Sequence, residues 1–162
     1  MCAEVIVVLA PDVREPTIPR GPEVRFVRDA REGEGPLAGL QAGLAAASTD
    51  LALVVGGDMP ELSTGVLLEM LRVAVEDRAD AVALQDGYRF RPLPSLVRVA
   101  TAVGVAKALL LGGERSLRTL LQTLRVAVID ESIWVALDPA RGSLHDVDEP
   151  GDLDVEPHRP EA

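Results

Sequence analysis

Residues 51–62 read LALVVGGDMPEL, and this stretch decides the fold class. Its first five residues are apolar without interruption, which is typical of a strand buried on both faces of a parallel sheet. Two glycines and Asp58 follow as a turn at the carboxyl end of that strand. Ligands of open α/β sheets bind outside these strand ends, so Asp58 lies where a cation and its phosphates would be held. An ordinary turn aspartate also fits these residues.

The composition indicates one globular domain. The chain has 162 residues, of which 48% are hydrophobic, and we expect a single domain over residues 1–155 with a polar tail over residues 156–162. Only 2% of the residues are aromatic and the formal charge is −10, which together argue against nucleic acid as a partner. A nucleotide substrate is compatible with this charge, because a divalent metal can mediate the binding of a triphosphate.

Cysteine content and hydropathy bear on the compartment. Cys2 is the only cysteine, which excludes a disulfide framework within the chain and a cysteine-based metal cluster. The first residues lack a basic segment, and their apolar run is too short for a signal peptide. No run approaches the roughly 18 apolar residues of a membrane span. We therefore expect a cytoplasmic protein without a membrane partner.

Apolar runs and helical periodicities alternate along the chain. Strands are expected at residues 5–9, 24–27, 51–55, 81–84, 93–99 and 126–129, with a further edge strand at 134–137. Helices are expected at about 35–48, 63–78, 100–111 and 116–124. The dipeptide Asp86-Gly87 predicts a tight hairpin turn. This alternation predicts a three-layer, Rossmann-like α/β fold whose sheet is mostly parallel with one antiparallel hairpin.

The helix expected after Gly35 has unusual glycines. Pro36 suits the first helical position, where its missing N–H is harmless. Gly39 and Gly43 each destabilise a helix by about 1 kcal/mol relative to alanine. Two interpretations account for them: close packing of the helix on the sheet, and approach of a ligand to the free N–H groups of the first turn.

Acidic side chains are expected at strand ends and cap positions. They are Asp29, Asp58 and the pair Asp146 and Asp148. Two separated aspartates that converge on one Mg²⁺ make a workable nucleotidyl-transfer site, because the metal bridges phosphate oxygens and stabilises the pyrophosphate leaving group. Positioning and electrostatics are then the protein's main contribution. Asp148 fits a helix N-cap before Pro150 equally well.

Five short motifs occur in order along the chain. They are GPLAGLQAGL from Gly35, VVGGDMPEL from Val54, RPLPSL from Arg91, GERSLRTLL from Gly113 and HDVDEPGDL from His145. Together they resemble the molybdenum cofactor guanylyltransferase family and the wider group of MobA-like nucleotidyltransferases, over roughly residues 5–153. The resemblance implies a nucleotidyltransferase fold, and an enzyme that transfers GMP from Mg-GTP to molybdopterin and releases pyrophosphate.

The resemblance also implies roles for individual residues. Asp58 matches the family's catalytic, metal-binding aspartate, and Asp148 matches a residue that gives a second contact to Mg²⁺. Asp29 matches an aspartate near the guanine nucleotide. Gly35 and Gly39 match the loop and helix start near the nucleoside.

One family motif has no counterpart in these residues. The resemblance implies an opening strand and a glycine-rich L-A-G-G-x-S-x-R-M-G-x-x-K loop around the triphosphate, and the 162 residues do not contain that pattern. We therefore expect the family's first strand and loop to be missing, which would leave a sheet edge open to self-association or to a companion chain. Two alternatives stay open: a non-catalytic nucleotide-binding or interaction module, and a related transferase with another base or acceptor.

Overall fold

The structure, a computed structural model, describes residues 2–18, 23–28 and 35–147. The contacts group into two compact units, which we describe separately. Unit 1 comprises Met1–Ala52 and Val97–Arg125, and unit 2 comprises Leu53–Leu96 and Val126–Ala162. The single domain expected over residues 1–155 stays a prediction.

The secondary structure follows the predicted order with one exception. The elements of the described residues are β1 (Val5–Leu9), β2 (Val24–Arg28), α1 (Pro36–Ala46), β3 (Leu51–Val54), α2 (Thr64–Glu76), β4 (Ala81–Asp86), β5 (Arg89–Arg98), α3 (Val99–Leu111), α4 (Leu117–Thr123), β6 (Val126–Ile129), α5 (Glu131–Leu137) and the 3-10 turn η1 (Gly142–Leu144). None of these described helices is both long and apolar enough to span a membrane.

The exception is the edge strand predicted at residues 134–137, which is wrong. These residues form the second half of α5, a helix that begins after Asp130 and carries Glu131 in its first turn. Trp134 is fully buried, and its indole N–H donates a 2.7 Å hydrogen bond to the carbonyl oxygen of Gln85. Because this buried indole needs both an apolar site and an acceptor, tertiary packing fixes the segment as a helix.

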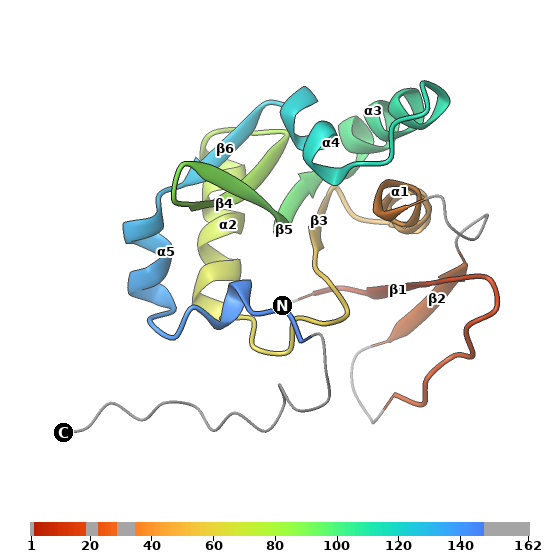
Figure 1. Cartoon of the computed structure of the whole chain (residues 1–162), viewed down its shortest axis with the longest axis horizontal. Helices are drawn as coiled ribbons and strands as arrows, with labels where there is room; N and C mark the ends of the chain where they lie inside the picture. Colours follow the sequence, from red (N-terminus) through yellow and green to blue (C-terminus); the bar gives the residue numbers. More distant parts are fainter. Residues whose placement is uncertain (1, 19–22, 29–34, 148–162) are drawn as a thin grey trace. The chain divides into compact units, whose positions relative to one another are not determined.

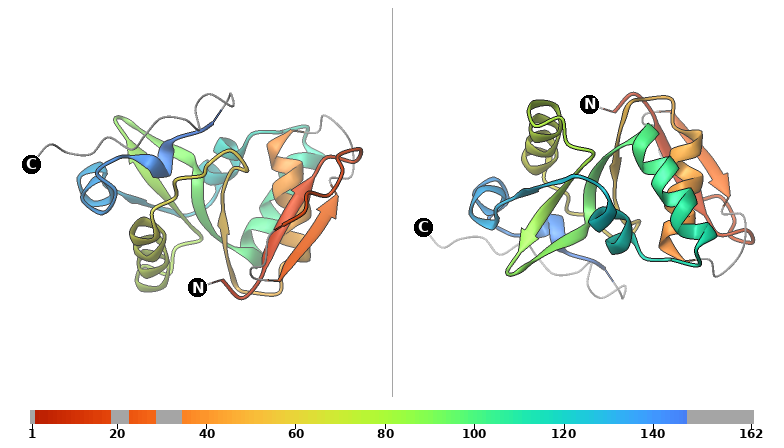
Figure 2. Two further views of the ribbon diagram at one scale, coloured as in Figure 1. Left: turned by 90° about the horizontal axis from the view of Figure 1, so that it is seen from below. Right: turned by 90° about the horizontal axis from the view of Figure 1, so that it is seen from above.

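Unit 1 is built around a short parallel strand pair. β1 and β2 pair in parallel, with Val5 opposite Val24, and α1 packs on both strands and on α3 (Figure 2). A Cβ at Gly43 would lie 3.0 Å from Val8 Cγ2, so this glycine lets α1 approach β1 closely. Packing against the sheet therefore accounts for Gly43.

Unit 2 contains most of the second sheet, whose strand order is β3-β5-β4-β6 (Figure 1). β4 and β6 run parallel, whereas a tight turn at Gly87, with φ +59°, joins β4 to β5. Residues 81–84 are fully buried, and α2 and α5 both pack on β4. The fold is therefore mixed α/β with partly parallel and partly antiparallel pairing, and the hairpin prediction is confirmed.

Candidate active site

The turn after β3 presents the Asp58 carboxylate at the surface of unit 2. Met59 is buried, and its sulfur accepts a 3.3 Å hydrogen bond from the Gly56 amide, which closes the turn. A Cβ at Gly56 would clash with Asp58 Oδ1 and would lie 3.2 Å from Met59 Cγ. The absence of a side chain at Gly56 therefore allows the carboxylate to fold back over the turn.

A second segment, residues 142–147, is hydrogen-bonded to this turn. The Val147 amide donates to the Asp58 carbonyl oxygen at 2.8 Å, and the Ser63 amide donates to Ser143 Oγ at 3.0 Å. Ser143 is fully buried, and its own amide donates to the Asp138 carboxylate at 2.7 Å. Bonds with buried partners hold segments together more firmly than exposed ones, so the Asp58 turn and residues 142–147 form one structure.

Close packing supports these hydrogen bonds. A Cβ at Gly142 would lie 2.8 Å from Glu61 Cβ and 2.9 Å from the Glu61 carbonyl oxygen, so glycine is required there. His145 Nδ1 lies 3.4 Å from Glu61 Oε2. The segment that carries Asp146 is thus fitted to the turn that carries Asp58.

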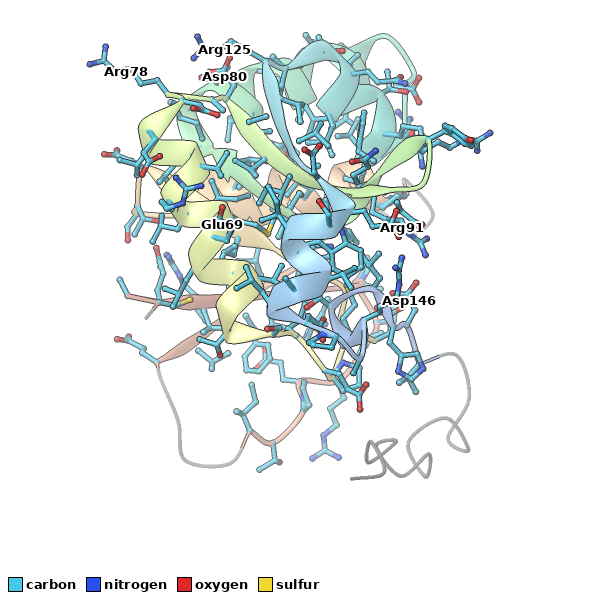
Figure 3. All side chains as sticks on the ribbon, turned by 90° about the vertical axis from the view of Figure 1, so that its left-hand side faces the viewer. Glu69, Arg78, Asp80, Arg91, Arg125 and Asp146 are labelled. Carbon is cyan, nitrogen blue, oxygen red and sulfur yellow. The ribbon has the colours of Figure 1, made fainter. Side chains whose placement is uncertain are left out.

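A pocket opens where these segments meet β5. It has a volume of about 160 Å³ and is lined by Asp58, Arg91, Pro92, Leu93, Leu144 and Asp146. Figure 3 shows Arg91 and Asp146 near one another on one side of unit 2. Two carboxylates, one guanidinium and the apolar side chains of Pro92, Leu93 and Leu144 thus line one small pocket.

The Arg91 guanidinium is held from outside the pocket. Its Nε forms an ion pair with Asp86, 2.9 Å from Oδ2, and Asp86 Oδ1 lies 3.5 Å from Nη2 of Arg141. Arg141 also donates to Glu131 at 2.7 Å and lies 4.8 Å from the centre of the Trp134 ring. The backbone N–H of Gly87, and next the Arg141 guanidinium, hold the pKa of the Glu131 carboxyl below its usual value.

The chemistry of the pocket fits a hard divalent cation. Mg²⁺ is usually held by one or two carboxylates, several waters and phosphate oxygens of the substrate. Asp58 and Asp146 supply two carboxylates to one pocket. Among residues 2–18, 23–28 and 35–147, no group of three or more His, Cys, Asp or Glu side chains could hold a metal alone. The two carboxylates of Asp58 and Asp146 fit the protein's share of such a magnesium site.

Two backbone N–H groups in the first turn of α1, in unit 1, donate hydrogen bonds to carbonyl oxygens of the protein itself. Gly35 has φ +80°, and a Cβ there would lie 3.2 Å from Arg115 Cβ. The Leu37 amide donates to the Arg115 carbonyl oxygen at 3.3 Å, and the Ala38 amide donates to the Gly35 carbonyl at 3.1 Å. These two N–H groups have protein partners, so at Gly35 the helix start is shaped by packing on residue 115.

The segment that reaches Gly35 is itself ordered by Glu114. Its carboxylate accepts hydrogen bonds from the backbone amides of Arg115 at 2.8 Å and Ser116 at 3.0 Å. These two bonds hold the pKa of the Glu114 carboxyl below its usual value. Ser116 then caps α4, as predicted, by accepting a bond from the Thr119 amide.

Comparison with known proteins identifies the family. The model of the MobA-like NTP transferase domain matches residues 1–129. This chain belongs to the MobA-like NTP transferase family.

Two relatives of this MobA-like chain have curated names. It is 34% identical over 156 residues to the probable molybdenum cofactor guanylyltransferase of Mycobacterium tuberculosis, covering 93% of this chain and 74% of that protein. It is 29% identical over 154 residues to the protein of the same name from Chloroflexus aggregans, covering 94% and 72% of the two chains.

Solved structures agree on the fold. The match to molybdopterin-guanine dinucleotide biosynthesis protein A from Archaeoglobus fulgidus has a TM-score of 0.66 at 24% identity, over 79% of this chain and 64% of that one. The match to 2-C-methyl-D-erythritol 4-phosphate cytidylyltransferase from Thermus thermophilus has a TM-score of 0.67 at 22% identity, over 93% and 79%. At these identities the likeness establishes a nucleotidyltransferase fold and no substrate.

The residues expected to form the MobA-like site are distributed unevenly. Asp58 lies in unit 2, Gly35 and Gly39 lie at the start of α1 in unit 1, and Asp29 and Asp148 lie outside the described residues. Arg91 was not predicted as a site residue, although its motif RPLPSL was noted. Its link to Asp86 depends on the hairpin, so the sequence offered only that motif as a signal.

Proposed function

We propose that this MobA-like protein transfers GMP from Mg-GTP to molybdopterin and releases pyrophosphate. The observation that carries the proposal is the Asp58 turn, whose carboxylate lines a pocket with Asp146 and Arg91 in a chain of this family. The 34% identity to a probable molybdenum cofactor guanylyltransferase favours guanine and molybdopterin over other substrates.

Asp58 and Asp148 would hold Mg²⁺, with Asp146 in the same segment as Asp148. When bound, the metal would stabilise charge on the phosphates and on the pyrophosphate leaving group. The chain's own contribution is to shape the turn that carries Asp58, through Gly56 and through the bond from the Val147 amide to the Asp58 carbonyl oxygen. Asp29, Gly35 and Gly39 would bind the nucleoside of GTP.

The test measures nucleotide binding and transfer in two forms of the protein. One form is the 162-residue chain, and the other is the same chain extended at Met1 by a strand and the L-A-G-G-x-S-x-R-M-G-x-x-K loop that the family resemblance implies. Calorimetry with GTP or CTP in MgCl₂ gives the base preference. Pyrophosphate release with molybdopterin gives the activity.

We expect GTP to bind more tightly than CTP, and GTP-dependent pyrophosphate release in the extended form. Tighter binding of CTP would replace the proposal by a transferase of another base. GTP binding without transfer in either form would favour a non-catalytic nucleotide-binding module. Equal and negligible binding of both nucleotides in both forms would contradict the proposal.

Variants of two aspartates distinguish a specific role of the site from a general effect of the protein's charge. Asp58→Asn should abolish transfer, because it removes the carboxylate that would bind the metal. Asp77→Asn makes the same carboxylate-to-amide change at an exposed aspartate at the end of α2, and it should leave transfer unchanged.

A further inference from the structure

We propose that Asp138 is a positioning residue of the candidate active site. Its buried carboxylate holds the segment that carries Asp146 in place beside the turn that carries Asp58. The inference rests on the proposed function in one respect, namely that these two carboxylates act on one metal ion. Asp138 does not line the pocket, so it acts only through the residues that it holds.

The burial of Asp138 is unusual for a carboxylate. It is the only charged side chain among the buried residues that the structure describes, with an exposed fraction of 8%. Taking a carboxylate out of water is unfavourable unless hydrogen bonds replace those to water. Asp138 Oδ2 accepts a 2.7 Å bond from the Ser143 amide, and a bond to an ionised acceptor is stronger than a neutral one. The contribution of the carboxylate is therefore its hold on Ser143.

Two further hydrogen bonds connect Ser143 to the start of α2 and back to the end of α5. The Ser63 amide donates to Ser143 Oγ at 3.0 Å, and Ser63 Oγ donates to the carbonyl oxygen of Leu137 at 3.2 Å. Leu137 precedes Asp138 in the chain, so the three bonds close a ring through three segments of unit 2. We call these four residues the anchoring ring. α2 and α5 pack on each other, which keeps their ends together in the ring (Figure 3).

Short stretches of chain connect the anchoring ring to both carboxylates of the pocket. Ser63 lies five residues after Asp58, and Ser143 lies three residues before Asp146. The bond from the Val147 amide to the Asp58 carbonyl oxygen, at 2.8 Å, joins the other ends of the same two stretches. The stretches are thus bonded to each other at both ends, so a shift of Ser143 would also shift Asp146.

Close packing limits how the two stretches can adjust. A Cβ at Gly142 would lie 2.8 Å from Glu61 Cβ, so no free space separates these two residues. Without the Asp138 carboxylate, the amide of the fully buried Ser143 would lose its acceptor. A buried donor without a partner is unfavourable, so the stretch would move to reach water and would take Asp146 with it.

A positioning role and a purely structural role have different consequences. A bond that only stabilises unit 2 changes the free energy of unfolding and leaves the folded pocket as it is. A bond that positions Asp146 also changes the folded protein. Two quantities report on the folded state: hydrogen exchange at the Val147 amide, and the affinity of the pocket for a divalent cation.

The experiment uses the 162-residue protein. Mn²⁺ is the probe for the cation, and its binding is measured by electron paramagnetic resonance; exchange at Val147 is measured by NMR without metal. We expect Asp138→Ala to speed up this exchange at least about tenfold, the factor expected when a buried donor loses its hydrogen bond. We expect it to weaken Mn²⁺ binding at least about tenfold, as is usual when a group that orients a metal ligand is removed.

Two further variants test the anchoring ring. Asp138→Asn keeps a side-chain oxygen that can accept the bond from the Ser143 amide, so it should recover most of the loss seen in Asp138→Ala. Ser143→Ala removes the acceptor of the Ser63 amide and should also speed up exchange at Val147. Because both substitutions act through one ring, Asp138→Ala and Ser143→Ala together should have less effect than the sum of their separate effects.

Val82→Ala is the matched control, since Val82 is fully buried in β4 and is not part of the anchoring ring. It should lower the free energy of unfolding and leave exchange at Val147 and Mn²⁺ binding in the folded protein unchanged. A far-ultraviolet circular dichroism spectrum like that of the unsubstituted protein establishes that each variant folds.

Three results decide the proposal. Lower stability alone in Asp138→Ala, as in Val82→Ala, would overturn it. Equal impairment of Asp138→Asn and Asp138→Ala would also overturn it, since charge and not the bond to Ser143 would then be the cause. Faster exchange at Val147 in Asp138→Ala, in a protein of which no form binds Mn²⁺, would contradict the metal site of the proposed function and support the positioning role of Asp138.

Discussion

The Val147 amide donates a 2.8 Å hydrogen bond to the carbonyl oxygen of Asp58. The bond is between backbone atoms, so it does not depend on the side chain at either position. It anchors the segment that leads to Asp148 on the turn that carries the expected catalytic carboxylate. Changes that move either backbone should therefore alter stability and metal binding together.

Gly56→Ala should weaken Mg²⁺ binding, because Asp58 Oδ1 must turn away from the new methyl group. The free energy of unfolding should change little, since the atoms that the methyl group would meet belong to the side chains of Asp58 and Met59. Chemical denaturation and calorimetry measure these effects. Gly57→Ala is the control, since a Cβ at Gly57 meets nothing within 4 Å. Equal behaviour of the two variants would show that the turn can rearrange freely.

Gly142→Ala should destabilise unit 2, because the new methyl group would lie 2.8 Å from Glu61 Cβ and 2.9 Å from its carbonyl oxygen. The expected loss in the free energy of unfolding is about 1–3 kcal/mol, measured by the fluorescence of Trp134, the only tryptophan, during denaturation. Gly104→Ala, in α3 with nothing within 4 Å, should instead stabilise its helix by about 0.5–1 kcal/mol. Destabilisation by both substitutions would contradict the assignment of the effect to the Glu61 contact.

Trp134→Phe should destabilise the protein by about 1–3 kcal/mol, because it leaves the carbonyl of Gln85 without its indole donor. Circular dichroism during urea denaturation measures this loss without the tryptophan signal. Tyr88→Phe, which alters a fully exposed side chain, should have no effect. A loss below about 0.5 kcal/mol for Trp134→Phe would mean that water replaces the donor.

Glu131→Gln should reduce the loss in the free energy of unfolding of unit 2 as the pH falls into the acid range. The folded pKa of the Glu131 carboxyl lies below the usual glutamate value of 4.5, so its contribution to stability is fully present above that pH. This contribution is lost as pH falls from 4.5 through the lowered folded pKa. Denaturation followed by Trp134 fluorescence at a series of pH values measures this dependence.

Glu114→Gln provides the comparison, because Glu114 has the same direction of pKa shift but lies in unit 1. It should change amide exchange at Arg115 and Ser116, whose amides donate hydrogen bonds to the Glu114 carboxylate. If Glu131→Gln loses stability at acid pH as much as the unsubstituted protein does, the acid sensitivity of unit 2 belongs to other groups.

Local sequence patterns predicted the strands and the larger helices well. The runs VIVVL at 5–9 and LALVV at 51–55 are continuously apolar, and both are strands as predicted. The dipeptide Asp86-Gly87 predicted its turn because these two residues readily adopt positive φ angles. Residues 134–137 were misassigned because the apolar run from Trp134 to Leu137 looks like a strand. Asp130 and Glu131 before them were the available helix signals.

The site was less predictable, because its parts are joined by contacts between distant residues. The position of Asp58 followed from the strand before it. The bond from Val147, the fit of Gly142 to Glu61 and the pairing of Arg91 with Asp86 depend on tertiary packing, which no local pattern specifies. Gly43 and Gly35 both contact protein atoms, whereas sequence alone left packing and ligand approach equally open for the glycines of this helix.

The close approach of Asp58 to Gly56 offers a criterion for sorting related sequences. A chain with any side chain two positions before the aspartate cannot hold its carboxylate in the orientation seen here. Such relatives must turn the aspartate outward or place its backbone differently, and their metal geometry should differ accordingly. A survey of that one position would divide the family into two structural groups before any of their activities is measured.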